Sequence, residues 1–183
     1  RPPLDERALG RLETALKRRD VAAFIMEPIV CNLAVEIPTA GFMTGAQALC
    51  RRHGTVFILD EVATGFGRTG TLFASEQCGL RPDLLVVGKG ITAGYLPMSA
   101  TVASGPVFDA FLGPDLSART LYHGHSYSGN ALAAAVALRH LEVAVQEVTT
   151  DDLVAAMAYQ FELIGLDLGE TPPLEVIVMA AEA

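Results

Sequence analysis

Cysteine is scarce in this sequence, whose 183 residues contain only Cys31, Cys50 and Cys78. Their number is odd, their spacing is wide, and no Cys-x-x-Cys pair occurs. A disulfide framework or a zinc site is therefore not expected, and no other metal site is predicted. Reduced thiols in a cytoplasmic protein fit the pattern better, because disulfides rarely persist in a reducing compartment.

Positive charge and long apolar runs are also lacking. The chain has 13 Lys and Arg residues against 21 Asp and Glu, a formal net charge of −8, so a nucleic-acid partner is not expected. The longest uncharged run, residues 90–108, is interrupted by Gly94, Pro97, Gly105 and Pro106, which argues against a membrane span. The first residues lead straight into a charged segment, so no signal peptide is expected.

What the sequence does have is short apolar runs that alternate with segments of helical spacing. Hydrophobic residues make up 51% of the chain, enough for a sizeable core in one domain. We expect strands at 21–26, 55–59, 83–87 and 98–103, the last a candidate for antiparallel pairing, and helices at 4–19, 41–53, 72–78, 106–112 and 130–146. Farther on, 151–163 is compatible with a helix and 174–179 with a strand.

This alternation predicts an α/β fold. Strands that are apolar throughout are typical of a mainly parallel sheet covered by helices on both faces. In such sheets ligands bind outside the carboxyl ends of the strands. Three predicted strands end in charged residues, namely Glu27, the pair Asp60 and Glu61, and Lys89. A charge directly after a buried strand costs free energy unless it is paired or functional, so these three ends form the candidate site.

Lys89 and Asp60 suggest a specific chemistry. Lys89 stands between Gly88 and Gly90, with little room to turn outward, and the glycines let a ligand approach the backbone closely. A lysine in such a place can form a Schiff base with an aldehyde. A carboxylate at a neighbouring strand end can keep a pyridine nitrogen protonated, and pyridoxal phosphate (PLP) needs both groups. A salt bridge between Lys89 and Asp60 is the simpler alternative, and the pattern alone leaves both open.

Four motifs resemble those of a known family. Residues 59–70, LDEVATGFGRTG, resemble the D-E-V-x-T-G-F-G-R-T-G signature of class III aminotransferases, which are PLP enzymes of fold type I. Residues 87–97, VGKGITAGYLP, are similar to the family's Schiff-base segment. IMEPI at 25–29 and HGHSYSGN at 123–130 resemble two further motifs, and all four stand in the family's order. The resemblance implies part of the PLP-dependent transferase large domain.

The resemblance also implies roles for four cofactor-binding residues. Lys89 would be the Schiff-base lysine and then the proton carrier, and Asp60 would pair with the pyridinium nitrogen. Val62 would pack against one face of the ring, although a core valine is the ordinary interpretation. Ser126 falls where the family places a hydroxyl that binds the phosphate of the neighbouring subunit's cofactor, which implies a homodimer.

Three more residues are candidates for substrate contact. Glu27, in the E-P motif, would lie near the substrate and help orient the site. His125 and Tyr127 flank Ser126 and could touch the substrate, although a solvent-facing loop histidine is an equally good interpretation. The loop that follows Glu27 departs from the family pattern, because the glutamine–glycine pair usual in the biotin-pathway members is missing.

The resemblance makes the chain an aminotransferase that takes a small-molecule amine donor and a keto acceptor. Within the class, 88–97 and 123–130 look most like members of biotin synthesis, which aminate 8-amino-7-oxononanoate to 7,8-diaminononanoate. Another ω-amine or amino-acid aminotransferase is the alternative, and a semialdehyde aminomutase fits less well. A catalytically inert fragment is a further interpretation from another class, because the family's phosphate loop, stacking aromatic and carboxylate-binding arginine are not recognisable. Residues 1–147 would be the second half of the large domain, and 148–183 a poorly matched tail that could begin the small C-terminal domain.

Overall fold

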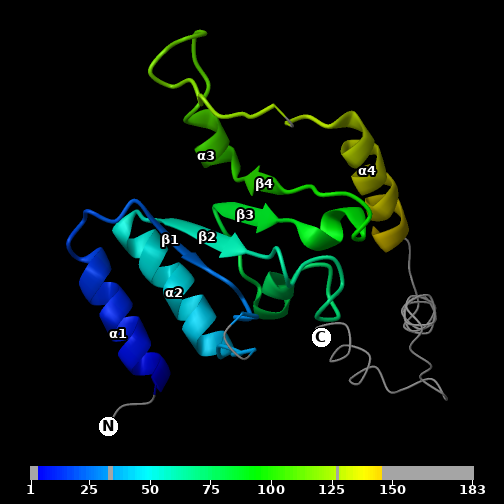
Figure 1. Cartoon of the computed structure of the whole chain (residues 1–183). Coiled ribbons are helices and arrows are strands. Elements are labelled where there is room, and N and C mark those ends of the chain that lie inside the picture. Colours follow the sequence, from blue (N-terminus) through cyan, green and yellow to red (C-terminus); the bar gives the residue numbers. More distant parts are fainter. Residues whose placement is uncertain (1–3, 33–34, 127, 146–183) are drawn as a thin grey trace, which may run out of the picture. The chain divides into compact units, whose positions relative to one another are not determined.

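A computed structural model describes residues 4–32, 35–126 and 128–145 (Figure 1). The chain divides into two units, residues 1–138 and 139–183, and only 139–145 of the second are described. The predictions for Tyr127, for the tail 148–183, and for the helix and strand expected within that tail lie outside the described residues. Among the described residues, no helix has the length and apolar character that crossing a bilayer requires.

One four-stranded sheet organises the first unit. Its strands are adjacent in chain order, the first three run parallel, and the fourth pairs antiparallel with the third. They are β1 (Ala23–Met26), β2 (Val56–Asp60), β3 (Leu84–Val87) and β4 (Ala100–Ala103). The expected mostly parallel α/β architecture, with an antiparallel last strand, is therefore confirmed.

The helices agree with the expected positions for the longer segments and differ for the short ones. The structure has α1 (Leu4–Leu16), α2 (Ala40–His53), the 3-10 helix η1 (Ala74–Cys78), the 3-10 helix η2 (Lys89–Thr92), α3 (Gly105–Asp109) and α4 (Ala131–Val145). The segment expected as a helix at 72–78 is the shorter 3-10 turn η1, and η2 was not predicted. Both turns are too short to show the hydrophobic repeat on which helix prediction depends.

Capping residues in the sequence define the ends of α2. The Thr39 side chain accepts a hydrogen bond from the Phe42 N–H over 3.1 Å, which satisfies a donor in the first turn. Gly54 follows the helix with φ of 68°, the left-handed conformation that glycine adopts without a Cβ penalty. The helix therefore stops where β2 must begin, and it lies along β2 on one side of the sheet (Figure 1).

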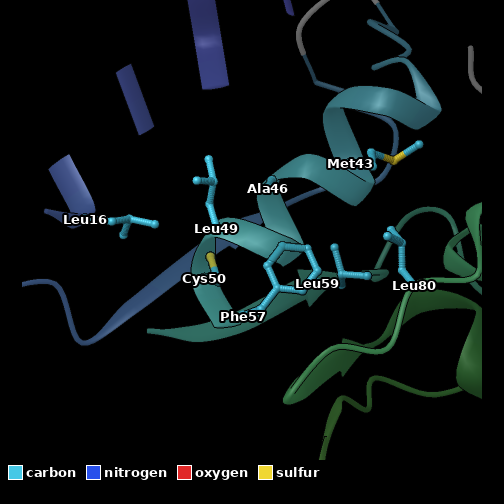
Figure 2. Close-up of a cluster of buried hydrophobic side chains, with 8 residues drawn as sticks. All are labelled: Leu16, Met43, Ala46, Leu49, Cys50, Phe57, Leu59 and Leu80. Atoms are coloured by element: carbon cyan, nitrogen blue, oxygen red, sulfur yellow. The ribbon is translucent and has the colours of Figure 1, made fainter. Parts of the chain in front are cut away.

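The main core lies between α1, α2 and one face of the sheet. Successive side chains of a strand point to opposite faces, and Phe57 and Leu59 of β2 are buried against the helices. Phe24 of β1 stacks on Phe57 with ring centroids 6.3 Å apart. Figure 2 shows the buried members of this cluster: Leu16, Met43, Ala46, Leu49, Cys50, Phe57, Leu59 and Leu80.

The opposite face of the sheet is less covered. It carries Val56, Ile58 and Asp60 of β2, which are half-buried, and Ile25 of β1, which is 58% exposed. The register pairs Ile25 with Ile58, so these side chains share a face. The sequence predicts helices on both faces, and the α1–α2 layer covers one of them. Asp60 thus leaves the sheet on the more open side.

Leu59→Ala is expected to lower the free energy of unfolding by about 3 kcal/mol, because it leaves a cavity in a fully buried site. Ile25→Ala, on the open face, should cost less than about 1 kcal/mol. Urea unfolding of the two variants against the unchanged chain measures both values. Equal losses would contradict the assignment of the core to the helix-covered face.

Cys50 is expected to be the least reactive thiol of the three. Burial, with a smaller contribution from the carboxylate of Asp83, raises the pKa of Cys50 to about 11. Because the thiolate is the reactive form, Cys50 should resist Ellman's reagent at pH 8 and react only after unfolding or as the pH approaches its pKa. Cys31 and Cys78 are only half-buried and should react first. Mass mapping of the modified peptides checks the order.

Candidate active site at the carboxyl ends of the parallel strands

The strand register brings the predicted charged residues to one edge of the sheet. Met26 pairs with Leu59, so Glu27 and Asp60 follow at the same level on neighbouring strands. Asp60 pairs with Val86, three residues before Lys89. The Glu61 N–H donates to the Val86 carbonyl over 2.8 Å and extends the pairing of β2 and β3 by one residue. The candidate site therefore lies where β1, β2 and β3 end, as the sequence predicts for parallel strands.

Asp60 is held in place by its own backbone turn. Its Oδ1 accepts a hydrogen bond from the Val62 N–H over 3.0 Å. The side chain is half-buried and lies on the open face of the sheet. Its other carboxylate oxygen forms no hydrogen bond with any residue in the described part of the chain. Asp60 can therefore accept a proton-bearing nitrogen from a ligand at this edge.

Glu61 has a different environment from Asp60, although the sequence predicts both at the same strand end. Its side chain is 0% exposed, because alternation turns it toward the opposite face from Asp60. Its carboxylate accepts three hydrogen bonds, from the Thr64 hydroxyl over 2.8 Å, the Ala74 N–H over 2.9 Å and the Ser75 N–H over 2.8 Å. A fully hydrogen-bonded buried carboxylate anchors a loop rather than presenting itself to a ligand.

Lys89 opens the turn η2 in an unusual backbone conformation. Its φ is 36°, in the left-handed region that residues with a Cβ rarely adopt. The expectation of an enclosed lysine is wrong, because the residue is exposed. The chain turns into η2 at this residue, so Lys89 does not continue the buried strand β3. Within the described residues Nζ forms no ion pair with Asp60, so the salt bridge that was the simpler alternative is not present.

The loop after Asp60 packs directly against the segment that carries Lys89. A Cβ built on Gly88 would lie 3.2 Å from Cγ1 of Val62, and one built on Gly90 would lie 3.1 Å from Cδ2 of Phe66. Phe66 in turn meets Phe73 edge to face, with ring centroids 5.5 Å apart. The two glycines that flank Lys89 are therefore needed for close approach. Val62, which follows the end of β2, therefore contacts the segment that follows β3, and its role as a wall for the ring stays a prediction.

Among the other predicted site residues, Glu27 and His125 form hydrogen bonds within their own loops. Glu27 is half-buried, and its Oε2 accepts the Cys31 N–H over 3.2 Å, which holds the loop after β1. His125 and Ser128 form a turn with hydrogen bonds of 3.0 Å in both directions. Ser126 is exposed within that turn, and no hydrogen bond in the described part of the chain ties it to Asp60 or Lys89. Tyr127 lies outside the described residues.

Comparison with known proteins shows to which family the chain belongs. The family model for class III aminotransferases matches residues 4–162. The chain belongs to the class III aminotransferases. It is 50% identical over 147 residues to an adenosylmethionine-8-amino-7-oxononanoate aminotransferase of Aquifex aeolicus, covering 79% of this chain and 32% of that protein. The chain therefore spans about a third of the length of this curated relative.

Solved structures give the same family. An (S)-enantioselective omega-transaminase of Thermomicrobium roseum superimposes with a TM-score of 0.70 and 37% identity, covering 86% of this chain and 36% of that one. An ornithine aminotransferase of Toxoplasma gondii gives a TM-score of 0.67 and 37% identity, covering 85% and 34%. The solved structures therefore show the aminotransferase fold, and the family model shows the class III family.

The residues present fit the PLP that this family uses. Asp60 offers an uncommitted carboxylate oxygen, Lys89 is exposed, and Val62 both bonds Asp60 through its N–H and contacts Gly88, the residue before Lys89. The described residues contain no cluster of three or more His, Cys, Asp or Glu side chains that could hold a metal ion.

Gly88→Ala is expected to destabilise the chain by about 1 kcal/mol, because the new methyl group crowds Val62. Val62→Ala should remove the crowding, so the double variant should cost less than the sum of the two single variants by about 0.5–1 kcal/mol. Urea unfolding of the four proteins in this cycle gives the coupling. Additive costs would mean that the two loops do not touch.

Proposed function

We propose that this chain supplies the lysine and aspartate half of a PLP site in an aminotransferase, which moves an amino group from a donor amine to a ketone or aldehyde. One observation carries the proposal: Asp60 ends β2 and Lys89 follows the adjacent parallel strand β3, and Val62 beside Asp60 contacts Gly88 beside Lys89. Family membership supplies the reaction class. The chain spans about a third of the length of its curated relative. The aminotransferase activity of the whole enzyme is therefore part of the proposal.

Each side chain has a task that its position supports. Bound at this edge, PLP would supply an aldehyde for amines and an aromatic ring that withdraws electrons. Asp60 would hold the proton on the ring nitrogen through its uncommitted oxygen, while the Val62 N–H keeps the other oxygen in place. Lys89 would bind the cofactor through Nζ and, once released by the donor amine, carry a proton to and from the reacting carbon. Val62 would fix the plane of the ring.

We propose 8-amino-7-oxononanoate as the acceptor. The Aquifex aeolicus relative, at 50% identity, carries this compound in its name, and motifs 88–97 and 123–130 resemble the biotin-pathway members. S-adenosylmethionine is the donor in the relative's name, and lysine is the other donor known among such members. An ornithine or ω-amine transaminase is the second candidate, favoured by the solved structures at 37% identity and by the divergent loop after Glu27.

The partner of this chain is proposed to be a second copy. From the family likeness we expect Ser126 to bind the phosphate of the neighbouring subunit's cofactor, and His125 and Tyr127 to contact the substrate. Glu27 directly follows β1, at the same level as Asp60 on β2, and would orient the substrate. The exposure of Ser126 in its turn is compatible with a contact across an interface. A cytoplasmic location is part of the same proposal.

Titration of the chain with PLP is expected to produce a visible absorption band characteristic of a cofactor bound covalently to a lysine. The chain has two lysines, Lys17 and Lys89, which provides a matched control. Lys17 is 63% exposed on α1 and pairs with Glu13. Lys89→Ala should abolish the band and Lys17→Ala should keep it, while Asp60→Asn should weaken binding about tenfold or more, as expected for the loss of a charged hydrogen bond. A band that survives in Lys89→Ala would overturn the proposal.

A further inference from the structure

We infer that Glu61 is a positioning residue for the proposed cofactor site. Neither the family likeness nor the functions proposed for Asp60 and Lys89 include this role. This inference rests on the proposed function for its consequence, but its geometry stands on the described contacts alone. The buried Glu61 carboxylate holds the turn that carries Asp60 and Val62, and it fixes both against the segment that carries Lys89.

The first support is where Glu61 lies in the chain. It sits directly between Asp60 and Val62, the two residues proposed to contact the cofactor ring, and its N–H pairs with the Val86 carbonyl of β3. Its own carbonyl accepts the Gly65 N–H over 2.9 Å. Backbone bonds therefore tie Glu61 to the neighbouring strand on one side and to its own loop on the other.

The second support is the side chain. The carboxylate accepts from the Thr64 hydroxyl and from the N–H groups of Ala74 and Ser75, which lie 13 and 14 residues further on. These bonds close a loop, residues 61–75, that contains Val62 and Phe66. No basic side chain of a described residue pairs with Glu61, so its charge depends on these three donors. Such a charge is costly to bury unless the donors stay aligned, which makes the loop rigid.

The third support is what the closed loop presses against. Val62 meets Gly88 and Phe66 meets Gly90, one glycine on each side of Lys89. The Val62 N–H is also the group that orients the Asp60 carboxylate. A shift of the loop would therefore move the aspartate, the ring wall and the lysine turn together. Precise mutual placement of such groups is what cofactor binding and proton transfer require.

Glu61→Gln tests this role, because it keeps the shape while an amide NH₂ replaces one accepting oxygen. Thr64→Val is the matched control, because it removes one donor from the same buried cluster and leaves both backbone N–H bonds in place. Amide hydrogen exchange of the chain without cofactor is the first measurement. Exchange at the Val62 N–H is expected to rise about tenfold in Glu61→Gln relative to the Phe57 N–H, which bonds Asp83 in the sheet. The rise should be smaller in Thr64→Val.

The second measurement is the pH dependence of the lysine–PLP absorption band. If Glu61 positions Asp60, the midpoint pH of the band in Glu61→Gln should shift in the same direction as in Asp60→Asn. A merely structural role would lower the unfolding midpoint and leave the band's midpoint pH where it is. Unchanged Val62 exchange, or an unchanged midpoint pH, would overturn the inference. If the unchanged chain forms no Lys89-dependent band, the proposed function fails by itself, while the exchange experiment still decides whether Glu61 holds the turn.

Discussion

The pairing of β2 with β3 is the constraint on which the rest of the site depends. Asp60 lies opposite Val86, and the Glu61 N–H bonds the Val86 carbonyl one step beyond the strand. Because β2 and β3 are parallel, the segments that follow them leave the sheet at the same edge and in the same direction. A shift of one residue would turn Asp60 into the helix-covered core and Glu61 toward the open face. The register thus decides which acid can reach a ligand.

The alternation of side chains at the end of β2 gives the adjacent acids Asp60 and Glu61 different environments. Asp60 is half-buried with one carboxylate oxygen uncommitted, whereas Glu61 is fully buried with three donors. The same alternation sends Phe57 and Leu59 into the core beneath α2, which anchors the strand that carries both. The five-residue strand β2 therefore carries core residues on one face and the candidate ligand-binding residue Asp60 on the other. Packing on one face fixes the position of the acid on the other.

Much of this could be predicted from sequence, because the strands are short apolar runs with charged ends. The strand expected at 55–59 is observed at Val56–Asp60, and that expected at 83–87 at Leu84–Val87. The family motifs indicate Asp60 and Lys89 as cofactor residues, and the register brings both to one edge of the sheet, while their roles stay predictions. The role of Glu61 was missed because its partners, Ala74 and Ser75, are distant in sequence and contribute only backbone N–H groups. No residue type marks such donors, although the alternation of β2 could have separated Glu61 from Asp60.

The exposure of Lys89 was also missed, and the reason is local geometry. Sequence reasoning treated the residue as a continuation of the buried strand, but the chain turns into η2 at that position with a positive φ. Glycines on both sides admit Val62 and Phe66 at close range, so the neighbouring loop occupies the space beside the lysine backbone. Ser126, His125 and Tyr127 stay predictions, because their roles depend on a second subunit or fall outside the described residues.

Borohydride reduction of the chain in the presence of PLP, followed by mass mapping, tests the central claim most directly. We expect the reduced cofactor on the peptide containing Lys89, at close to one equivalent, and we expect Asp60→Asn to lower this yield at limiting PLP. Attachment mainly to Lys17 or to the amino terminus, or a yield at Lys89 that does not respond to Asp60, would contradict it.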